Sequence, residues 1–197
     1  MREKMRGTAP KERVDGTPPL LVADMRTGVD VRSKNGFAFR MRLLGEGDGM
    51  ALREFFGGMS KKSVENRFNS TAIPDDYIKK LLSPSGGIRA AIATVPNGGR
   101  ERIIGLAEYG VGDDERFPDL SVAVADEHMG RGVGGRLVDW AIADAMGGDH
   151  DGFSLQMRIE NTAIHRLMRN AIGKHGMGTS DRWDDKGDIG YKIVFKD

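Results

Sequence analysis

Glycines that follow an apolar run are the residues of this chain whose spacing most clearly suggests chemistry. The apolar run covers residues 120–125, and the glycines after it are Gly130, Gly132, Gly134 and Gly135. This order predicts a buried strand, a short turn and a helix that begins near Gly132. The first turn of a helix has N–H groups without partners inside the helix, and it carries partial positive charge. Because glycine has no Cβ atom, an anion can approach these N–H groups, and we interpret the segment as a diphosphate-binding turn.

Two basic residues support that interpretation. Arg131 and Arg136 lie in the same segment and are expected to add positive charge beside the anion. A simpler explanation is that the glycines only turn the chain. It is less favoured, because a turn does not require so many glycines and each Gly at a helix start costs about 1 kcal/mol relative to Ala.

The segment also matches a dinucleotide fingerprint, which keeps a nucleotide-dependent oxidoreductase as an alternative. Gly130-x-Gly132-x-x-Gly135 has the required spacing, and Asp149 and Asp151 follow at about the expected distance of 20 residues. These acids precede a predicted strand at Phe153, whereas the fingerprint acid ends a strand. The chain left after Gly135 is also short for a full dinucleotide-binding domain. A P-loop is excluded, because no Gly-Lys-Ser/Thr follows the glycines.

Length and charge exclude further function classes. The chain has 197 residues, with 30 Lys and Arg against 29 Asp and Glu, so its formal net charge is +1. That balance argues against a nucleic-acid or membrane partner bound through bulk charge. The chain has no cysteine, which excludes thiolate metal ligands, and its four histidines lack metal-ligand spacing, so we expect no metal. No signal sequence or long apolar run is present, and we expect a soluble, cytoplasmic protein.

The distribution of Gly, Pro and apolar residues divides the chain into a leader and one domain. Residues 1–27 are rich in Pro, Gly and charge and are expected to form a mobile leader or an arm over the core. Residues 28–197 are expected to form a single domain. Asn35-Gly36, between two alternating segments, predicts a hairpin. Three short helices are expected next, the first two with Asp48 and Ser60 as N-caps.

Strands and helices alternate in the rest of the chain. Helices are predicted over 132–146 and 161–172, and strands over 88–95, 103–109, 120–125, 153–157 and 191–195. The acidic segment around Trp183 lacks the closing Glu of a calcium loop and is predicted to be a hairpin loop. Together these elements predict an α/β fold with a mixed sheet and helices on both faces.

The glycine segment resembles the acyl-CoA signature of the GNAT superfamily of N-acetyltransferases, Arg/Gln-x-x-Gly-x-Gly/Ala after a Val-rich strand. Gly132 and Gly134 stand at the glycine positions, and Met129 stands where Arg or Gln is usual. Residues 161–167 resemble the later motif of the superfamily, in which an Asn opens the helix beside the pantetheine arm. The resemblance extends from Phe37 to Phe195. It implies a mostly antiparallel sheet that is splayed at the acyl-CoA site.

Three further segments resemble the bacterial protein lysine acetyltransferases that modify acyl-CoA synthetases. Residues 59–68 are similar to their Leu-Ser-x-x-Ser-x-x-x-Arg-Phe motif, and residues 105–109 to their Gly-x-Ala-Glu-Tyr strand. Residues 119–126 are similar to their Glu-Phe-Ala-Val-x-Val-Ala-Asp strand, with Asp119 in place of the Glu.

These resemblances imply acetyl-CoA as the co-substrate and a main-chain N–H of the strand as the oxyanion donor. They also imply that the strand pairs with the pantetheine amides. The residues expected to contact acetyl-CoA are Val122, Ala123, Val124, Met129, Gly130, Arg131, Gly132, Val133, Gly134, Gly135, Arg136, Asn161 and Ile164.

A carboxylate is needed to take the proton of the attacking amine, whose pKa is near 10.4 for lysine. The resemblance places this general base at Asp119, directly or through water, and Glu108 on the neighbouring strand is the alternative. Asp119 has the simpler explanation of a solvated loop-end carboxylate, and Glu108 that of a partner for a nearby Arg. The superfamily often has a Tyr that protonates the thiolate, and this chain has Met168 there.

The expected acceptor is a primary amine, favoured to be the lysine of a protein such as an acyl-CoA synthetase. A small-molecule amine is the closest alternative. A CoA-binding regulatory module without catalysis is another, because Asp119 and Met168 depart from the superfamily pattern. The sequence does not indicate an oligomeric state.

Overall fold

A computed structural model describes residues 22–85, 87–110, 116–148 and 150–195 of the chain. The strands are β1 (Val29–Arg32), β2 (Ala38–Leu43), β3 (Ile88–Asn97), β4 (Arg100–Gly110), β5 (Asp119–Val124), β6 (Gly152–Arg158), β7 (Gly178–Asp185) and β8 (Asp188–Val194). The α-helices are α1 (Gly49–Gly57), α2 (Lys61–Phe68), α3 (Tyr77–Leu82), α4 (Val133–Met146) and α5 (Thr162–His175), and short 3-10 helices are η1 (Val22–Arg26), η2 (Glu46–Asp48) and η3 (Asp126–His128).

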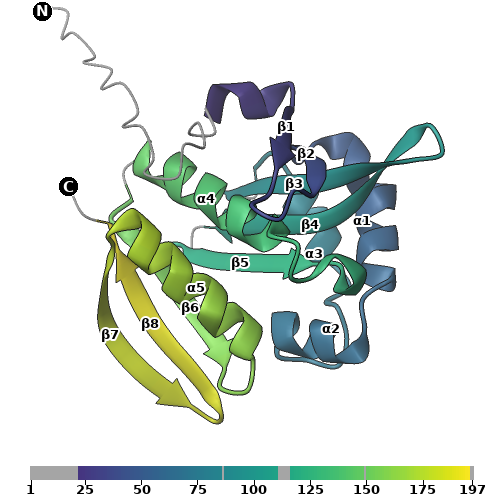
Figure 1. Cartoon of the computed structure of the whole chain (residues 1–197). Coiled ribbons are helices and arrows are strands. Elements are labelled where there is room, and N and C mark those ends of the chain that lie inside the picture. The colour runs from purple at the N-terminus through teal and green to yellow at the C-terminus, as the bar shows by residue number, and fades with distance from the viewer. Residues whose placement is uncertain (1–21, 86, 111–115, 149, 196–197) are drawn as a thin grey trace, which may run out of the picture.

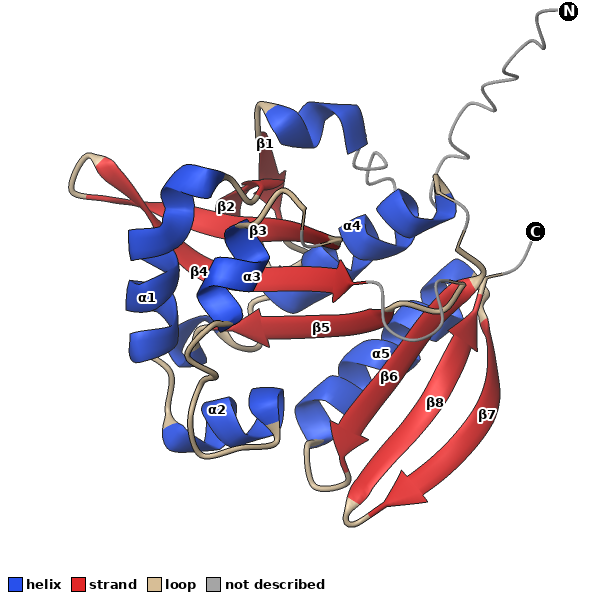
Figure 2. Ribbon diagram, turned by 180° about the vertical axis from the view of Figure 1, so that it is seen from behind, coloured by secondary structure: helices blue, strands red, loops and turns tan. Residues whose placement is uncertain are grey.

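The strands form one sheet in the order β1-β2-β3-β4-β5-β6-β8-β7. Neighbours are antiparallel except for β5 and β6, which are parallel and paired only at Asp119 and Ser154. From this pair the two strands diverge toward their carboxyl ends, as Figures 1 and 2 show. The sheet is therefore mixed, mostly antiparallel and splayed between β5 and β6, as predicted.

Helices cover both faces of the sheet. One apolar cluster lies under α4 and α5 and includes the fully buried Trp140 and Phe153. The other lies under α1 and α3 and includes Phe56, Ile92 and Leu106. Along β6, β8 and β7, α5 packs on one face, and Figure 2 looks onto the other. The two layers of helices and the sheet confirm the predicted fold class.

The order of elements before the glycine segment also follows the sequence prediction. The hairpin β1–β2 and the three short helices are present. Ser60 caps α2 by accepting a hydrogen bond from the N–H of Ser63. Asp48 lies at the start of α1 without a side-chain cap, because Arg42 donates to both of its carboxylate oxygens. Of the predicted leader, residues 1–21 lie outside the described residues. Its last part contains η1, in which Met25 is fully buried.

The C-terminal region differs from the prediction. The segment around Trp183, expected as a loop, is mostly strand β7, and the last strand begins at Asp188 rather than Tyr191. The hairpin turn is limited to Lys186 and Gly187. The sequence of β7 does not predict a strand, because β7 is an edge strand. Its side chains are largely exposed and show no apolar alternation.

Candidate functional site

The glycine segment forms the sharp connection between β5 and α4. Gly130 and Gly132 have φ values of +73° and +84°, which only glycine adopts readily, and Gly132 is the N-cap of α4. The N–H of Arg136 donates to the carbonyl of Gly132 at 3.3 Å. This is the first hydrogen bond within the helix, so the N–H groups of residues 133–135 have no acceptor there. The helix start therefore presents free N–H donors and the positive end of the helix dipole.

The glycines of this turn differ in why they lack a side chain. A Cβ at Gly132 would lie 2.9 Å from the Cβ of Ser33, and one at Gly134 would lie 3.3 Å from a methyl carbon of Leu167. Packing within the chain therefore explains these two. Cβ atoms at Gly130 and Gly135 would meet no atom within 4 Å. The open space at Gly135, in the first turn of α4, leaves room for a ligand.

The two arginines of the segment are placed differently. Arg131 is exposed, with its guanidinium 5.1 Å from the ring centre of Phe37. Arg136, expected beside an anion, is only 8% exposed and donates to the carbonyl of Arg32. It also lies 3.9 Å from Asp139. Arg136 therefore anchors α4 to β1. Met129 and Arg131 are exposed, as are Asp126 and Glu127 earlier in the same connection.

The divergence of β5 from β6 leaves one edge of β5 without a strand partner. The N–H of Ala125 donates to the carbonyl of Ile104 in β4, and alternate residues of a strand direct their N–H groups to the same side. The N–H and C=O groups of Val122 and Val124 therefore point into the gap between β5 and β6. Ala123 directs its main chain to β4, and its side chain packs under α1 and α3. The free β5 edge leads directly to the helix start of α4.

The start of α5 lies at the far side of this gap. Asn161 is its N-cap, and its side-chain oxygen accepts from the N–H of Ile164 at 3.3 Å. Ile164 is half-buried against the cluster under α4 and α5. The amide of Asn161 therefore caps α5, and this structural role accounts for its position.

Both candidate carboxylates lie on the sheet face that α1 and α3 cover. Asp119 and Ser121 alternate with Ala123 on that face, and Glu108 is directly opposite Ser121. Asp119 is exposed at the pair that joins β5 to β6. Glu108 is only 7% exposed. The two groups therefore share a face but differ sharply in their environment.

Glu108 belongs to a buried polar cluster. Arg67, at the end of α2, and the hydroxyl of Tyr77, at the start of α3, both donate to its Oε1 atom, while the buried Oε2 has no hydrogen-bond partner. Burial raises the pKa of Glu108, and the neighbouring Arg67 and Tyr77 oppose that shift. Arg67 fits the sequence expectation of an arginine partner for Glu108. Tyr77 was not identified from the sequence, where it is only an apolar position of a short helix.

Two further contacts tie the helical segments to the site. Asp126, just after β5, accepts hydrogen bonds from the N–H of Ser60 at 2.8 Å and from the hydroxyl groups of Ser60 and Ser63. Asn69, which follows α2, donates to the buried Asp188 of β8 at 2.7 Å. These contacts join residues that are distant along the chain, so the sequence does not predict them.

The described residues show no cluster of three or more His, Asp or Glu side chains suited to a metal ion. Within the same residues, none of the helices has the length and apolar character to cross a membrane.

Comparison with known proteins places this geometry in context. Residues 64–173, more than half of the chain, match the model of the "Acetyltransferase (GNAT) family". No curated protein matches the chain in sequence.

Solved structures share the fold at low identity. The GNAT domain of S. lividans PAT is 18% identical, with a TM-score of 0.72 over 85% of this chain and 97% of that domain. The cAMP-binding acyltransferase of Mycobacterium smegmatis is also 18% identical, with a TM-score of 0.57; the match covers 89% of this chain but 52% of that protein. The yncA protein of Salmonella typhimurium, solved with its cofactor acetyl-CoA, is 17% identical, with a TM-score of 0.61 over 81% of this chain and 94% of that one.

Proposed function

The chain belongs to the GNAT acetyltransferase family, and on that premise we propose that it transfers an acetyl group from acetyl-CoA to the side-chain amine of a protein lysine. Membership makes the protein an acyltransferase. The acetyl donor, the acceptor and the roles of individual residues are the parts that we propose.

The observation that carries the proposal is the continuity between the free edge of β5 and the helix start of α4. Acetyl-CoA has a diphosphate at one end of its arm and two amides along the pantetheine. The N–H groups at the start of α4 suit the diphosphate, and the space at Gly135 admits it. The main-chain groups of Val122 and Val124 suit the pantetheine amides, which would pair with β5 as an added strand.

Each step of acetyl transfer then requires a group of the protein or water. The lone pair of the amine forms a C–N bond to the thioester carbonyl, and the carbonyl oxygen becomes an oxyanion. A main-chain N–H of the free β5 edge donates to that oxyanion. Collapse of the intermediate breaks the C–S bond. The thiolate has a pKa near 8.5 as a free thiol, so water is sufficient to protonate it. Met168 is fully buried and has no proton to give.

We propose Asp119 as the general base. It lies on β5 three residues before Val122, at the point where the gap closes, and its exposure admits an incoming amine. Glu108 faces the same side but already binds Arg67 and Tyr77 through one oxygen. We assign Glu108 to positioning α2 and α3 around the acceptor.

The exposure of Asp119 favours an acceptor presented by another macromolecule. A lysine side chain is long enough to reach an exposed carboxylate while the rest of the acceptor stays outside. A small amine would gain most of its binding energy from an enclosing pocket.

A direct test is to measure CoA release from acetyl-CoA with three sets of acceptors: lysine-containing proteins such as acyl-CoA synthetases, short lysine peptides, and small amines. The expected result is turnover with a protein acceptor, and acetyl-lysine found in it by mass spectrometry. Turnover with small amines alone would assign a small-molecule acceptor. Binding of acetyl-CoA without turnover over the whole panel would favour a regulatory module.

A further inference from the structure

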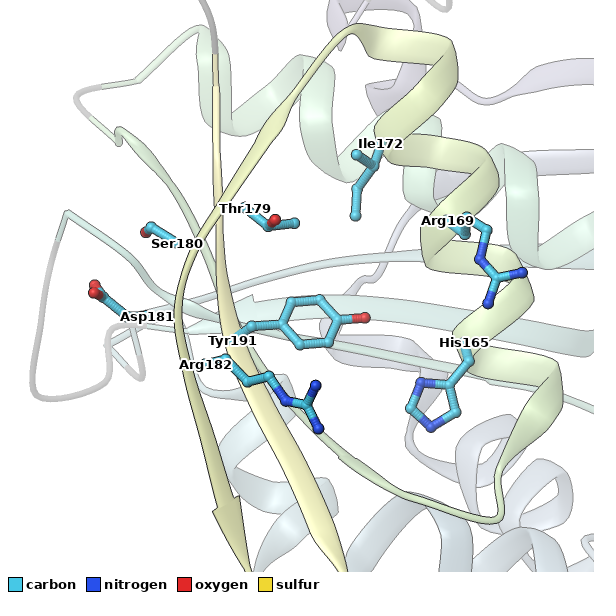
Figure 3. Close-up of a pocket in the computed structure, with 8 residues that line it drawn as sticks. All are labelled: His165, Arg169, Ile172, Thr179, Ser180, Asp181, Arg182 and Tyr191. Carbon is cyan, nitrogen blue, oxygen red and sulfur yellow. The ribbon is translucent and has the colours of Figure 1, made fainter.

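A groove of about 470 Å³ lies between α5 and the β7–β8 hairpin, away from the glycine turn. Its volume is within the roughly 300–1,000 Å³ of small-molecule sites. Figure 3 shows that Tyr191 of β8 projects across the groove toward α5, with Ile172 above it. Thr179 of β7 also lines the groove. The groove thus has an aromatic and aliphatic lining.

Two arginines and a histidine converge on one end of the groove. Figure 3 shows Arg169 and His165 of α5 and Arg182 of β7 around the hydroxyl end of Tyr191. Burial raises the pKa of Tyr191, and the positive charge of the nearby Arg169 opposes that shift. Arg169 and Arg182 are cationic and come from elements on both sides of the groove, so together with His165 they face a shared space.

Few carboxylates of the described residues neutralise the charge of these arginines. Within the residues that the structure describes, Arg169 has no ion pair with a carboxylate. Arg182 contacts Asp184 at 3.4 Å, and both side chains are largely exposed, with relative areas of 68% and 64%. His165 has one ring nitrogen, Nε2, 3.0 Å from the carbonyl of Arg158. Asp181 lines the groove, but Figure 3 shows its carboxylate on the far side of β7.

An irregularity of β7 places Arg182 in this position. The pairing of β7 with β8 shifts register between Ser180 and Trp183, and Asp181 has a φ of +48°. A bulge of this kind redirects side chains relative to a regular strand. Here it turns Asp181 away from the groove and Arg182 toward it. The left-handed backbone of Asp181 in this edge strand therefore accompanies the orientation of Arg182 toward the groove.

The groove is separate from the proposed acetyl-CoA site. Leu167 of α5 approaches Gly134 of the glycine turn. Arg169 is two residues further along α5 and therefore lies on nearly the opposite side of that helix. The groove and the glycine turn flank α5 on different sides.

We propose that this groove binds a small organic phosphate whose substituent is aromatic or apolar. The phosphate would lie among Arg169, Arg182 and the Tyr191 hydroxyl, with the ring of His165 beside them. Guanidinium groups bind phosphate oxygens through paired hydrogen bonds. The substituent would pack against Ile172 and the ring of Tyr191. The inference does not depend on acetyl transfer, so it stands or fails independently of the proposed function.

The test is calorimetric titration of the full chain with phenyl phosphate, inorganic phosphate and benzoate. Phenyl phosphate is expected to bind more tightly than the other two probes. Arg169→Gln and Arg182→Gln are each expected to weaken it by about tenfold or more. Arg166→Gln is the matched control, because Arg166 is an exposed arginine of the same helix that does not line the groove. This control is expected to change affinity less than about twofold.

Three results would overturn the proposal. The first is the absence of phenyl phosphate binding to the folded wild-type chain. The second is equal weakening by Arg166→Gln and Arg169→Gln, which would indicate general surface charge. The third is complete loss of phenyl phosphate binding at saturating CoA, which would make the groove part of the CoA site. Circular dichroism of each variant separates these results from misfolding.

Discussion

Asp119 and Glu108 share a sheet face and a chemical group, yet substitution should affect them in different ways. Asp119→Asn removes an exposed carboxylate, so we expect little change in melting temperature and a fall in kcat of about 10²–10⁴-fold. Glu108→Gln leaves the largely buried Arg67 guanidinium without its counter-charge, so the free energy of unfolding should fall by about 3–5 kcal/mol. Steady-state kinetics and urea denaturation of both variants measure the contrast. An Asp119→Asn enzyme with unchanged kcat would remove Asp119 from the mechanism.

His128, which lies just before the glycine segment, makes a pH-dependent contribution to the free energy of unfolding. His128 is 8% exposed, and burial is the main reason that its pKa lies below the ordinary value of 6.5. Below pH 6.5 the unfolded chain binds a proton that the folded chain does not. Stability from this residue is therefore present above pH 6.5 and is lost as the pH falls toward the folded-state pKa, with a slope of at most about 1.4 kcal/mol per pH unit.

His128→Gln should reduce that slope while the contributions of the carboxylates remain. Thermal unfolding of both proteins between pH 7.5 and 5.5 measures the difference. Parallel curves for the two proteins would show that His128 titrates alike in the folded and unfolded chains.

The residues of the glycine turn were predictable because local rules determine them. Positive φ values and a strand-to-helix junction have a direct signature in glycine spacing. The burial of Arg136 was not predictable in the same way, because its acceptor is the carbonyl of Arg32, about a hundred residues earlier. The position of Tyr77 beside Glu108 depends likewise on how α3 packs over the sheet.

At the scale of elements, Asp126 joins α2 to the end of β5. Burial alone would raise the pKa of Asp126, but hydrogen bonds from Ser63 and Ser60 hold it below 3.8. Its stabilising contribution is therefore present above pH 3.8 and is lost as the pH falls below that value. Asp126→Ala should lower the free energy of unfolding by about 1 kcal/mol at pH 7. Urea titrations at neutral and acid pH measure this loss, and an equal loss at both would contradict it.

Elements with strong periodic or capping signals were predicted at nearly their observed positions. Helix α4 has an apolar stripe ended by Gly147, and α2 begins at its Ser60 cap. Strand β7 was missed because it is an edge strand, for which the sequence need not alternate between buried and exposed side chains. Its irregular pairing with β8 weakened the pattern further.

At the scale of the whole molecule, the sheet is divided by the gap between β5 and β6. Within the sheet, β5 and β6 pair at Asp119 and Ser154. The hydrogen bond from Asn69 to Asp188 is a second connection between the two parts, because Asn69 follows α2. Asn69 has a φ of +48°, so Asn69→Gly removes the amide without straining the backbone. We expect a loss of about 1–2 kcal/mol in unfolding free energy.

The same variant should accelerate hydrogen exchange in β6 and β8 more than in β3 and β4, which hydrogen-exchange mass spectrometry resolves. Uniform exchange across the sheet would show that this contact does not hold the two parts together. The sequence predicted the splayed sheet through its family resemblance, but not this contact, which joins residues more than a hundred positions apart.

The central claim is that the start of α4 binds the diphosphate of acetyl-CoA, and calorimetric titration of Gly135 variants tests it most directly. A Cβ at Gly135 meets no atom within 4 Å, so Gly135→Ala and Gly135→Glu should both fold, and an acid in the first helical turn is stabilising. Gly135→Gln is the neutral control of equal size. We predict tight binding to wild type, a small change for Gly135→Ala, a larger loss for Gly135→Gln and the largest for Gly135→Glu, about 100-fold or more. Equal affinity of wild type and Gly135→Glu, or no binding by the folded wild type, would contradict the claim.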